Sequence, residues 1–259
     1  MLLMIETLLL IFAALEQDHR AFAAGSVYPL DKALNSVDAQ YKDCKVKMAN
    51  LVKTKYLKKE LNSMPVYKKV WKAGEKKYVK KPVGPLTKNH LIALYVYTDS
   101  NLYKDFNSAT RNGRKQYTQK TFKWYSLHFL LTEAVQILRK TQGCMKTYRG
   151  TSVEFTKNVL NKEIRFGSFA SSSLDPNVAQ SFGSVSCFEI LTCHGAHVGP
   201  YSQFFYEKEV LIPPYEKFRV TAVRTKQYHF NLWCNTVYTL KSTGTKSDLN
   251  CAMTSKKAG

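Results

Sequence analysis

Acidic residues are scarce in this chain, whose 259 residues include 19 Asp and Glu against 39 Lys and Arg, for a net charge of +20. Glycine and proline are also few, at 12 and 8, and no internal repeat occurs, which excludes collagen-like, low-complexity and solenoid architectures. After the first 15 residues no apolar run reaches the length of a transmembrane helix, and the polar C-terminus lacks the apolar tail of a glycolipid-anchor signal. We therefore predict a globular protein without a transmembrane segment.

The N-terminus differs in character from the rest of the chain. Residues 2–15 are almost wholly apolar, and residues 21–23 form an A-x-A pattern like that of a signal-peptide cleavage site. Glu6 interrupts the apolar stretch and no Lys or Arg precedes it, so a short hydrophobic helix is the alternative interpretation. We predict a signal peptide over residues 1–23, a single domain over residues 24–259, and a secreted, extracellular product.

Cysteines form an even set of six, which in a secreted chain is compatible with up to three disulfide bonds. They are Cys44, Cys144, Cys187, Cys193, Cys234 and Cys251. Their spacing alone assigns no pairs. Cys193 lies close to His194 and His197, but no second group of Cys or His occurs at zinc-site spacing. We therefore predict that the protein binds no metal.

Much of the positive charge lies between residues 45 and 81, where several lysines occur in pairs. Such a surface favours polyanions at low salt. The aromatic residues interleaved with these lysines are Tyr56, Tyr67, Trp71 and Tyr78. Interleaving of this kind also occurs in single-strand nucleic-acid binders, but a helical layer with its aromatics inward and its lysines outward explains it better. No motif for specific nucleic-acid recognition is present, and non-specific binding to polyanions or anionic cell surfaces stays open.

Hydrophobic patterning divides the chain into two halves. Residues 125–138 show the i, i+3, i+4, i+7 recurrence of a helix with one buried face. From Cys144 onward, short β-branched and aromatic stretches alternate with turn residues. The strands predicted there are Met145–Tyr148, Ser168–Ser173, Cys187–Leu191, Glu207–Ile212, Lys217–Val223, Tyr228–Leu232 and Thr236–Leu240. We predict an α+β fold in which a helix-rich half, about residues 26–143, shares one core with a mainly antiparallel β half, about residues 144–255.

Two carboxylates stand side by side in Glu207-Lys208-Glu209, between an aromatic run and an apolar run. Because side chains alternate along a strand, Glu207 and Glu209 are predicted to share one face while Lys208 points to the other. On this spacing alone, a solvated strand edge is the simpler explanation.

The order of three segments changes that interpretation. Arg149 lies at a predicted strand end, a run of serines follows at residues 171–173, and the Glu-x-Glu strand comes third. This order resembles the R-S-ExE signature of the arginine-specific mono-ADP-ribosyltransferases, the vertebrate ecto-enzymes related to cholera-type toxins. Supporting stretches over about residues 26–255 are Leu94–Thr98, Asp105–Asn107, His128–Thr132, Thr192–Ala196, Tyr201-Ser202, Glu209–Glu216, Ser242–Gly244 and Asn250-Cys251.

The resemblance implies a catalytic role for four residues. Glu209 would hydrogen-bond the ribose 2′-hydroxyl of NAD and stabilise positive charge as nicotinamide leaves, much as carboxylates do in glycoside-cleaving sites. Glu207 would orient an acceptor guanidinium and help to remove its proton. Arg149 would donate to an NAD phosphate, and Ser171 would hold Glu209 in position.

The resemblance also implies an NAD-binding set that adds Tyr97, Gly150 and Ser202 to Arg149. Gly150 would let the ligand approach the backbone, and Tyr97 and Ser202 match positions that contact NAD in relatives. Lys208 departs from the acidic residue common at its position in close relatives, so we expect a shifted acceptor preference.

Further implications concern the disulfide bonds and the core. The family's conserved disulfides map to Cys44–Cys251 and Cys144–Cys193, which leaves Cys187 and Cys234 as an extra pair or as free thiols. The implied β half is a mainly antiparallel β-sandwich of the ADP-ribosyltransferase type.

The predicted activity is transfer of a single ADP-ribose from the co-substrate NAD to arginine side chains of extracellular proteins, with release of nicotinamide. The predicted partners are NAD and arginine-containing acceptor proteins, and a monomer is expected. Two alternatives stay open: an NAD glycohydrolase that uses water as the acceptor, and a catalytically weak cationic protein that binds polyanions.

Overall fold

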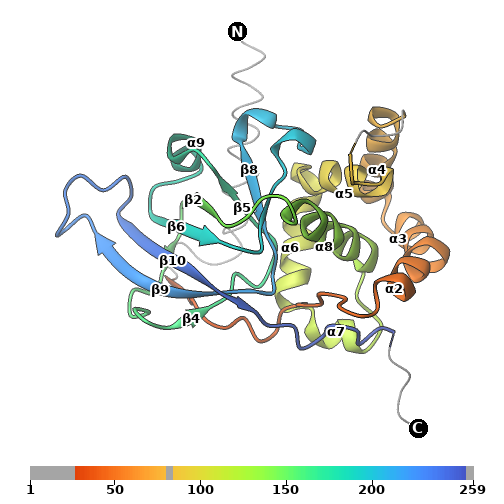
Figure 1. Cartoon of the computed structure of the whole chain (residues 1–259), viewed down its shortest axis with the longest axis horizontal. Helices are drawn as coiled ribbons and strands as arrows, with labels where there is room; N and C mark the ends of the chain where they lie inside the picture. Colours follow the sequence, from red (N-terminus) through yellow and green to blue (C-terminus); the bar gives the residue numbers. More distant parts are fainter. Residues whose placement is uncertain (1–26, 80–83, 255–259) are drawn as a thin grey trace.

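The computed structural model describes residues 27–79 and 84–254, so the predicted signal peptide lies outside the described residues (Figure 1). The helices from α2 to α8 gather on one side of the molecule, whereas α9 lies with the strands on the other side, and the β9–β10 hairpin projects away from the helices α2 to α8. The predicted α+β fold class is confirmed. In the part of the chain that the structure describes, no helix combines the length and the apolar character needed to cross a bilayer.

The helical half is built around two buried helices, α5 and α8, that pack on each other. Its elements are α2 (Lys45–Leu51), the π-helical turn η2 (Val52–Tyr56), α3 (Leu57–Ser63), α4 (Pro65–Lys77), α5 (Lys88–Tyr97), α6 (Ser100–Asn112), α7 (Arg114–Thr118) and α8 (Tyr125–Arg139). The helix predicted over residues 125–138 is α8, one residue longer. In α4, Tyr67 and Trp71 are buried whereas Lys68 and Lys72 are exposed, as predicted.

The β half contains one sheet of eight strands and a separate two-stranded pair. The elements are β1 (Val27–Tyr28), β2 (Met145–Thr151), β3 (Glu154–Phe155), β4 (Glu163–Ile164), β5 (Ala170–Ser173), α9 (Pro176–Ser181), β6 (Ser186–Thr192), β7 (Ala196–His197), the 3-10 turns η3 (Gly199–Tyr201) and η4 (Phe205–Glu207), β8 (Glu209–Ile212), β9 (Glu216–Thr225) and β10 (Thr236–Thr245). The sheet order is β4-β9-β10-β6-β2-β5-β8-β7, and every neighbouring pair except β10 and β6 is antiparallel.

The predicted strand Tyr228–Leu232 is wrong. Residues 226–235 form turns that connect β9 to β10, and the N–H groups of Tyr228 and His229 both bond to the carbonyl of Thr225. The aromatic and polar residues alternate here as they do in strands, but Tyr228 and Phe230 are 75% and 86% exposed. Alternation predicts a strand only where one face is covered, and nothing in the described chain covers these rings.

A single residue pair, Tyr148 opposite Ser173, joins β2 to β5, and the sheet divides at this point. Beyond it, β5 and β8 form an inner layer whose side chains face two cores. Leu211 packs against the helical half, whereas Ile212 packs against side chains of β6, β9 and β10. The β-sandwich is therefore present. The helical half shares one core cluster with Phe169, Ala196 and Leu211 of the β half, as predicted, and a second cluster lies between the strands of the β half.

Three disulfide bonds link distant parts of the chain. The two pairs implied by the resemblance are present, Cys44–Cys251 and Cys144–Cys193, and the remaining two cysteines form Cys187–Cys234. The first closes a loop between residues 207 positions apart and joins the start of α2 to the C-terminal segment. Closing loops of this kind stabilises the folded state by about 2–4 kcal/mol for each bond.

A buried ion pair joins three segments beneath the β half. The Arg165 guanidinium lies 2.7 Å from the Asp38 carboxylate, and both side chains are almost completely buried. Arg165 also donates to the carbonyls of Lys32, Ala33 and Lys246, while Asp38 accepts from the N–H of Leu249. The pair therefore anchors the N-terminal and C-terminal segments to the loop after β4.

Removal of the negative charge should destabilise the fold strongly. We expect Asp38→Asn to lower the free energy of unfolding by about 3–5 kcal/mol, because it leaves the buried Arg165 cation without a counter-charge. The exposed ion pair between Lys157 and Glu154 provides the control, and Glu154→Gln should cost less than about 1 kcal/mol. Urea unfolding of the oxidised protein measures both, and equal losses in the two variants would contradict the assignment.

Candidate active site

The predicted site residues meet at the point where the sheet divides. Ser173 of β5 lies opposite Tyr148 of β2 on one side and opposite Glu209 of β8 on the other. Arg149 follows Tyr148, and Ser171 lies two residues before Ser173 on the same face. Strand pairing thus brings the end of β5 and the start of β8 beside β2. Arg149 lies within β2 and not at the strand end that the sequence predicted, because β2 continues to Thr151.

Arg149 and Ser171 are linked directly. The Arg149 guanidinium donates to the Ser171 carbonyl over 2.7 Å. The Ser171 hydroxyl lies 3.3 Å from the hydroxyl of Tyr97, at the C-terminal end of α5. Tyr97 is 1% exposed, and Asn107 of α6 donates to its hydroxyl over 3.4 Å. Tyr97 therefore lies behind Ser171, where it supports the serine from the helical side.

Glu209 is a buried carboxylate at the first position of β8, only 4% exposed. Burial raises its pKa, while the hydroxyls of Ser171 and Ser202 and the positive charge of Arg149 act in the opposite direction. Its Oε2 atom finds no hydrogen-bond donor among the described residues. Buried oxygens are normally paired, so this atom is suited to accept a hydrogen bond from a ligand hydroxyl.

The prediction that Glu207 lies in a strand with Glu209 is wrong. Glu207 ends the 3-10 turn η4, and the strand begins only at Glu209. Lys208 between them has a φ of +48°, the left-handed conformation, which breaks the alternation of an extended chain. The turn is held by the Ser173 hydroxyl, which donates to the Glu207 carbonyl over 2.7 Å, and by the Leu174 N–H, which donates to the Lys208 carbonyl.

Glu207 nevertheless lies close enough to Glu209 to be affected by its charge. Burial raises the pKa of Glu207 to about 8, and the negative charge of Glu209 adds to the shift. At neutral pH the free protein therefore holds Glu207 mainly in its protonated, neutral form. Two carboxyl groups with raised pKa values at one end of the sheet are typical of a catalytic site.

Comparison with known proteins agrees with this geometry. The sequence model of the family described as NAD:arginine ADP-ribosyltransferase matches residues 30–243. The chain belongs to this family. It is 36% identical to the Homo sapiens ecto-ADP-ribosyltransferase 5 over 211 residues, which covers 75% of this chain and 72% of the relative. It is also 36% identical to the Gallus gallus NAD(P)(+)--arginine ADP-ribosyltransferase 2 over 241 residues, which covers 89% and 74%.

A solved relative shows the same fold with a dinucleotide bound. It is a mutant of the eucaryotic mono-ADP-ribosyltransferase ART2.2 in complex with NADH, with a TM-score of 0.71 and 32% identity over 86% of this chain and 98% of that one. The chain is therefore an ADP-ribosyltransferase whose co-substrate is NAD. Over residues 27–79 and 84–254, no group of three or more His, Cys, Asp or Glu is placed to hold a metal ion.

Two residues of this ADP-ribosyltransferase were missed by the sequence analysis. Asp175 accepts from the Lys208 ammonium over 3.0 Å and also caps α9, so it links Lys208 to a fixed element. Lys208 therefore holds the turn between the two glutamates. Asp175 followed by Pro176 is a readable helix start that could have pointed to it. Asn107 lies in a stretch that supports the resemblance, but its contact with Tyr97 is not readable from sequence.

Gly150 and Ser202 were predicted to contact NAD, and in the structure both lie against other parts of the protein. A Cβ atom at Gly150 would lie 2.2 Å from the carbonyl oxygen of Ala179, so the absent side chain makes room for α9. Ser202 is 6% exposed and lies beside Glu209, and its hydroxyl accepts from the Phe204 N–H. The roles of Gly150, Ser202 and Tyr97 in NAD binding stay predictions.

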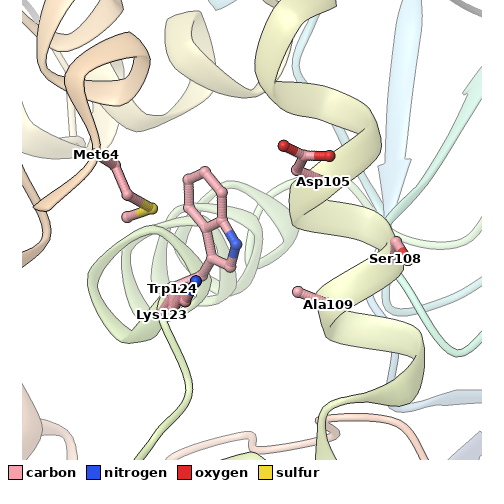
Figure 2. A pocket seen from close by; sticks show the side chains of 6 residues that line it. All are labelled: Met64, Asp105, Ser108, Ala109, Lys123 and Trp124. Carbon is pink, nitrogen blue, oxygen red and sulfur yellow. The ribbon is translucent and has the colours of Figure 1, made fainter.

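A hollow elsewhere on the enzyme is not part of this site. Figure 2 shows it between α6 and the start of α8, with the Trp124 indole between Met64 and α6. Its volume is about 420 Å³, and it is lined by Met64, Asp105, Ser108, Ala109, Lys123 and Trp124. None of the predicted catalytic or NAD-binding residues lines it.

The pKa of Glu207 is open to direct measurement. In protein labelled with ¹³C at the glutamate carboxyl, we expect the Glu207 signal to titrate near pH 8, because burial and Glu209 both disfavour its anion. In Glu209→Gln the midpoint should move down, since the neighbouring charge is gone, while burial keeps it above its ordinary value. The signal is assigned by its loss in Glu207→Gln. An unchanged midpoint in Glu209→Gln would show that the two groups do not interact.

Proposed function

We propose that this ADP-ribosyltransferase transfers one ADP-ribose from NAD to arginine side chains of extracellular proteins and releases nicotinamide. The observation that carries the proposal is the buried Glu209 carboxyl group beside Arg149 and Ser171, with Glu207 close to it. Among the described residues, Oε2 of Glu209 has no hydrogen-bond donor. An extracellular site of action is supported by the three disulfide bonds and by relatives named as ecto-enzymes.

Cleavage of NAD is assigned to Glu209. The bond between nicotinamide and C1′ of the ribose breaks, nicotinamide leaves as a neutral base, and C1′ gains positive charge. The Glu209 carboxylate accepts a hydrogen bond from the ribose 2′-hydroxyl and stabilises that charge in a buried site, where electrostatic interactions are strong. Arg149 binds a phosphate of NAD and favours the ionised form of Glu209. Ser171 and Ser202 orient the carboxylate.

Attack by the acceptor is assigned to Glu207. An arginine guanidinium is protonated at any physiological pH and is a poor nucleophile. The Glu207 carboxylate orients one N–H group and accepts its proton while the nitrogen forms the new bond to C1′. The acceptor cation also stabilises the anion of Glu207, which offsets the raised pKa when the acceptor is bound. In the hydrolysis reaction, where water is the acceptor, no guanidinium has to be deprotonated and Glu207 is not required.

Substitution of each glutamate separates the two steps. We expect Glu207→Gln to reduce transfer to arginine about 10²–10⁴-fold and to spare NAD hydrolysis, because only the acceptor loses its base. Glu209→Gln should reduce both reactions at least about 10²-fold, because the charge at C1′ is no longer stabilised. Released nicotinamide and labelled ADP-ribosyl arginine are measured together.

The exposed Glu75→Gln on α4 is the matched control and should leave both rates unchanged. Two outcomes would reject the proposal: no nicotinamide release from NAD by the wild-type protein, or equal losses of transfer and hydrolysis in Glu207→Gln.

The share of ADP-ribose that is transferred to arginine instead of water should depend on pH. Since the pKa of Glu207 is raised to about 8, its carboxyl is neutral below that pH and becomes a base above it. The ratio of arginine transfer to hydrolysis at low acceptor concentration should therefore rise between pH 6 and pH 9. The acceptor itself does not titrate in this range. In Glu207→Gln the ratio should stay low and flat, whereas a flat ratio in the wild type would contradict the assigned role.

A further inference from the structure

The outer helices of the helical half carry a dense positive surface that the active site does not use. We call it the lysine face and define it by the exposed lysines of α2 to α4: Lys47, Lys53, Lys55, Lys58, Lys59, Lys68, Lys69, Lys72, Lys76 and Lys77. Between residues 45 and 79, Glu75 is the exposed carboxylate, because Glu60 is 4% exposed. Figure 1 shows α2, α3 and α4 along the outer edge of the molecule, on the side away from the sheet.

The charges of the lysine face are not neutralised by the described chain. None of its ten ammonium groups takes part in the ion pairs that join described residues. Like charges at this density repel one another and concentrate anions from solution. A polyanion that displaces those counterions gains free energy from their release.

The arrangement of the lysines fits an extended ligand better than a small anion. Lys68, Lys72 and Lys76 recur every four residues, which places them on one side of α4 at steps of about 6 Å along its axis. Lys58 and Lys59 lie on α3, which directly precedes α4 in the chain and packs against it. A row of charges of this kind matches a linear polymer that carries a negative group on each unit.

The chemistry of the surface favours a polysaccharide over nucleic acid. Single-strand nucleic-acid sites stack bases on exposed aromatic rings, but Tyr56, Tyr67 and Trp71 are 8%, 0% and 2% exposed. The fourth interleaved ring, Tyr78, is partly exposed, but it packs against Tyr95 and its hydroxyl donates to the Tyr201 carbonyl. Base-edge recognition uses the planar fork of arginine, and residues 45–79 contain no arginine. Lysine recognises its partner here through charge alone, which suits a polymer that presents sulfate groups.

We propose that the lysine face binds sulfated polysaccharides of the heparan sulfate class. The binding holds the enzyme at surfaces that carry such chains, and it uses none of the residues assigned to NAD or to the acceptor. An extracellular location, which belongs to the proposed function, supplies this ligand class. Binding itself is tested without NAD, so its failure leaves the proposed function intact.

The test compares two variants of equal net charge. One replaces Lys68, Lys69, Lys72 and Lys76 by Gln, and the control replaces Lys115, Lys140, Lys162 and Lys241, which are also exposed. Affinity for heparin is measured by titration at several salt concentrations. In the first variant we expect the slope of log affinity against log salt to fall by about 3, because four contacts are lost, and by less than about 1 in the control. NAD cleavage and thermal unfolding should match the wild type in both variants.

Two results would overturn the proposal. Equal losses in the two variants would show that net charge acts without a defined surface. Tighter binding of the wild type to single-stranded or duplex DNA than to heparin, at equal concentrations of charged groups, would assign the lysine face to nucleic acid.

Discussion

The pairing of β5 with β2 and β8 is the constraint on which the active site depends. One residue pair holds β5 to β2, so β5 and β8 can leave the plane of the outer sheet and form the inner layer of the sandwich. The same register sets Ser173 beside Glu209, and the Ser173 hydroxyl then fixes the turn that carries Glu207. The pairing of β5 therefore determines where the sheet divides, how the core packs and where the two carboxyl groups lie.

The electrostatic state of the site follows from that arrangement. Glu209 is buried because it begins a strand that is covered on both faces, and its neighbours offset only part of the cost of its charge. Glu207 lies half-buried at the end of the turn, where burial and the negative charge of Glu209 both raise its pKa. In the proposed reaction the two carboxyl groups therefore act differently: Glu209 supplies a charge that is held in place beside the sugar, whereas Glu207 is neutral in the free protein and ionises when a cationic acceptor binds.

The sequence was sufficient for the fold class and the family, because the order of the motif residues carries the resemblance without knowledge of register. The structure places Arg149, Ser171 and Glu209 near one another, while their catalytic roles stay predictions. The sequence was insufficient where contacts distant in sequence decide the conformation. The left-handed Lys208 depends on Ser173 and Asp175, which lie more than 30 positions earlier, so Glu207 looked like part of a strand. Tyr228–Leu232 alternates like a strand but has no covered face.

Because the basic surface is built from lysine and not arginine, it limits how far copies of the enzyme can modify one another. Of 39 basic residues, 31 are lysine and 8 are arginine. Each arginine that the structure describes donates to a protein partner, and these arginines are Arg111, Arg114, Arg139, Arg149, Arg165, Arg219 and Arg224. An amine cannot replace a guanidinium in the proposed reaction. The molecule can thus be strongly basic and crowded on a surface while it offers neighbouring copies few places for self-modification.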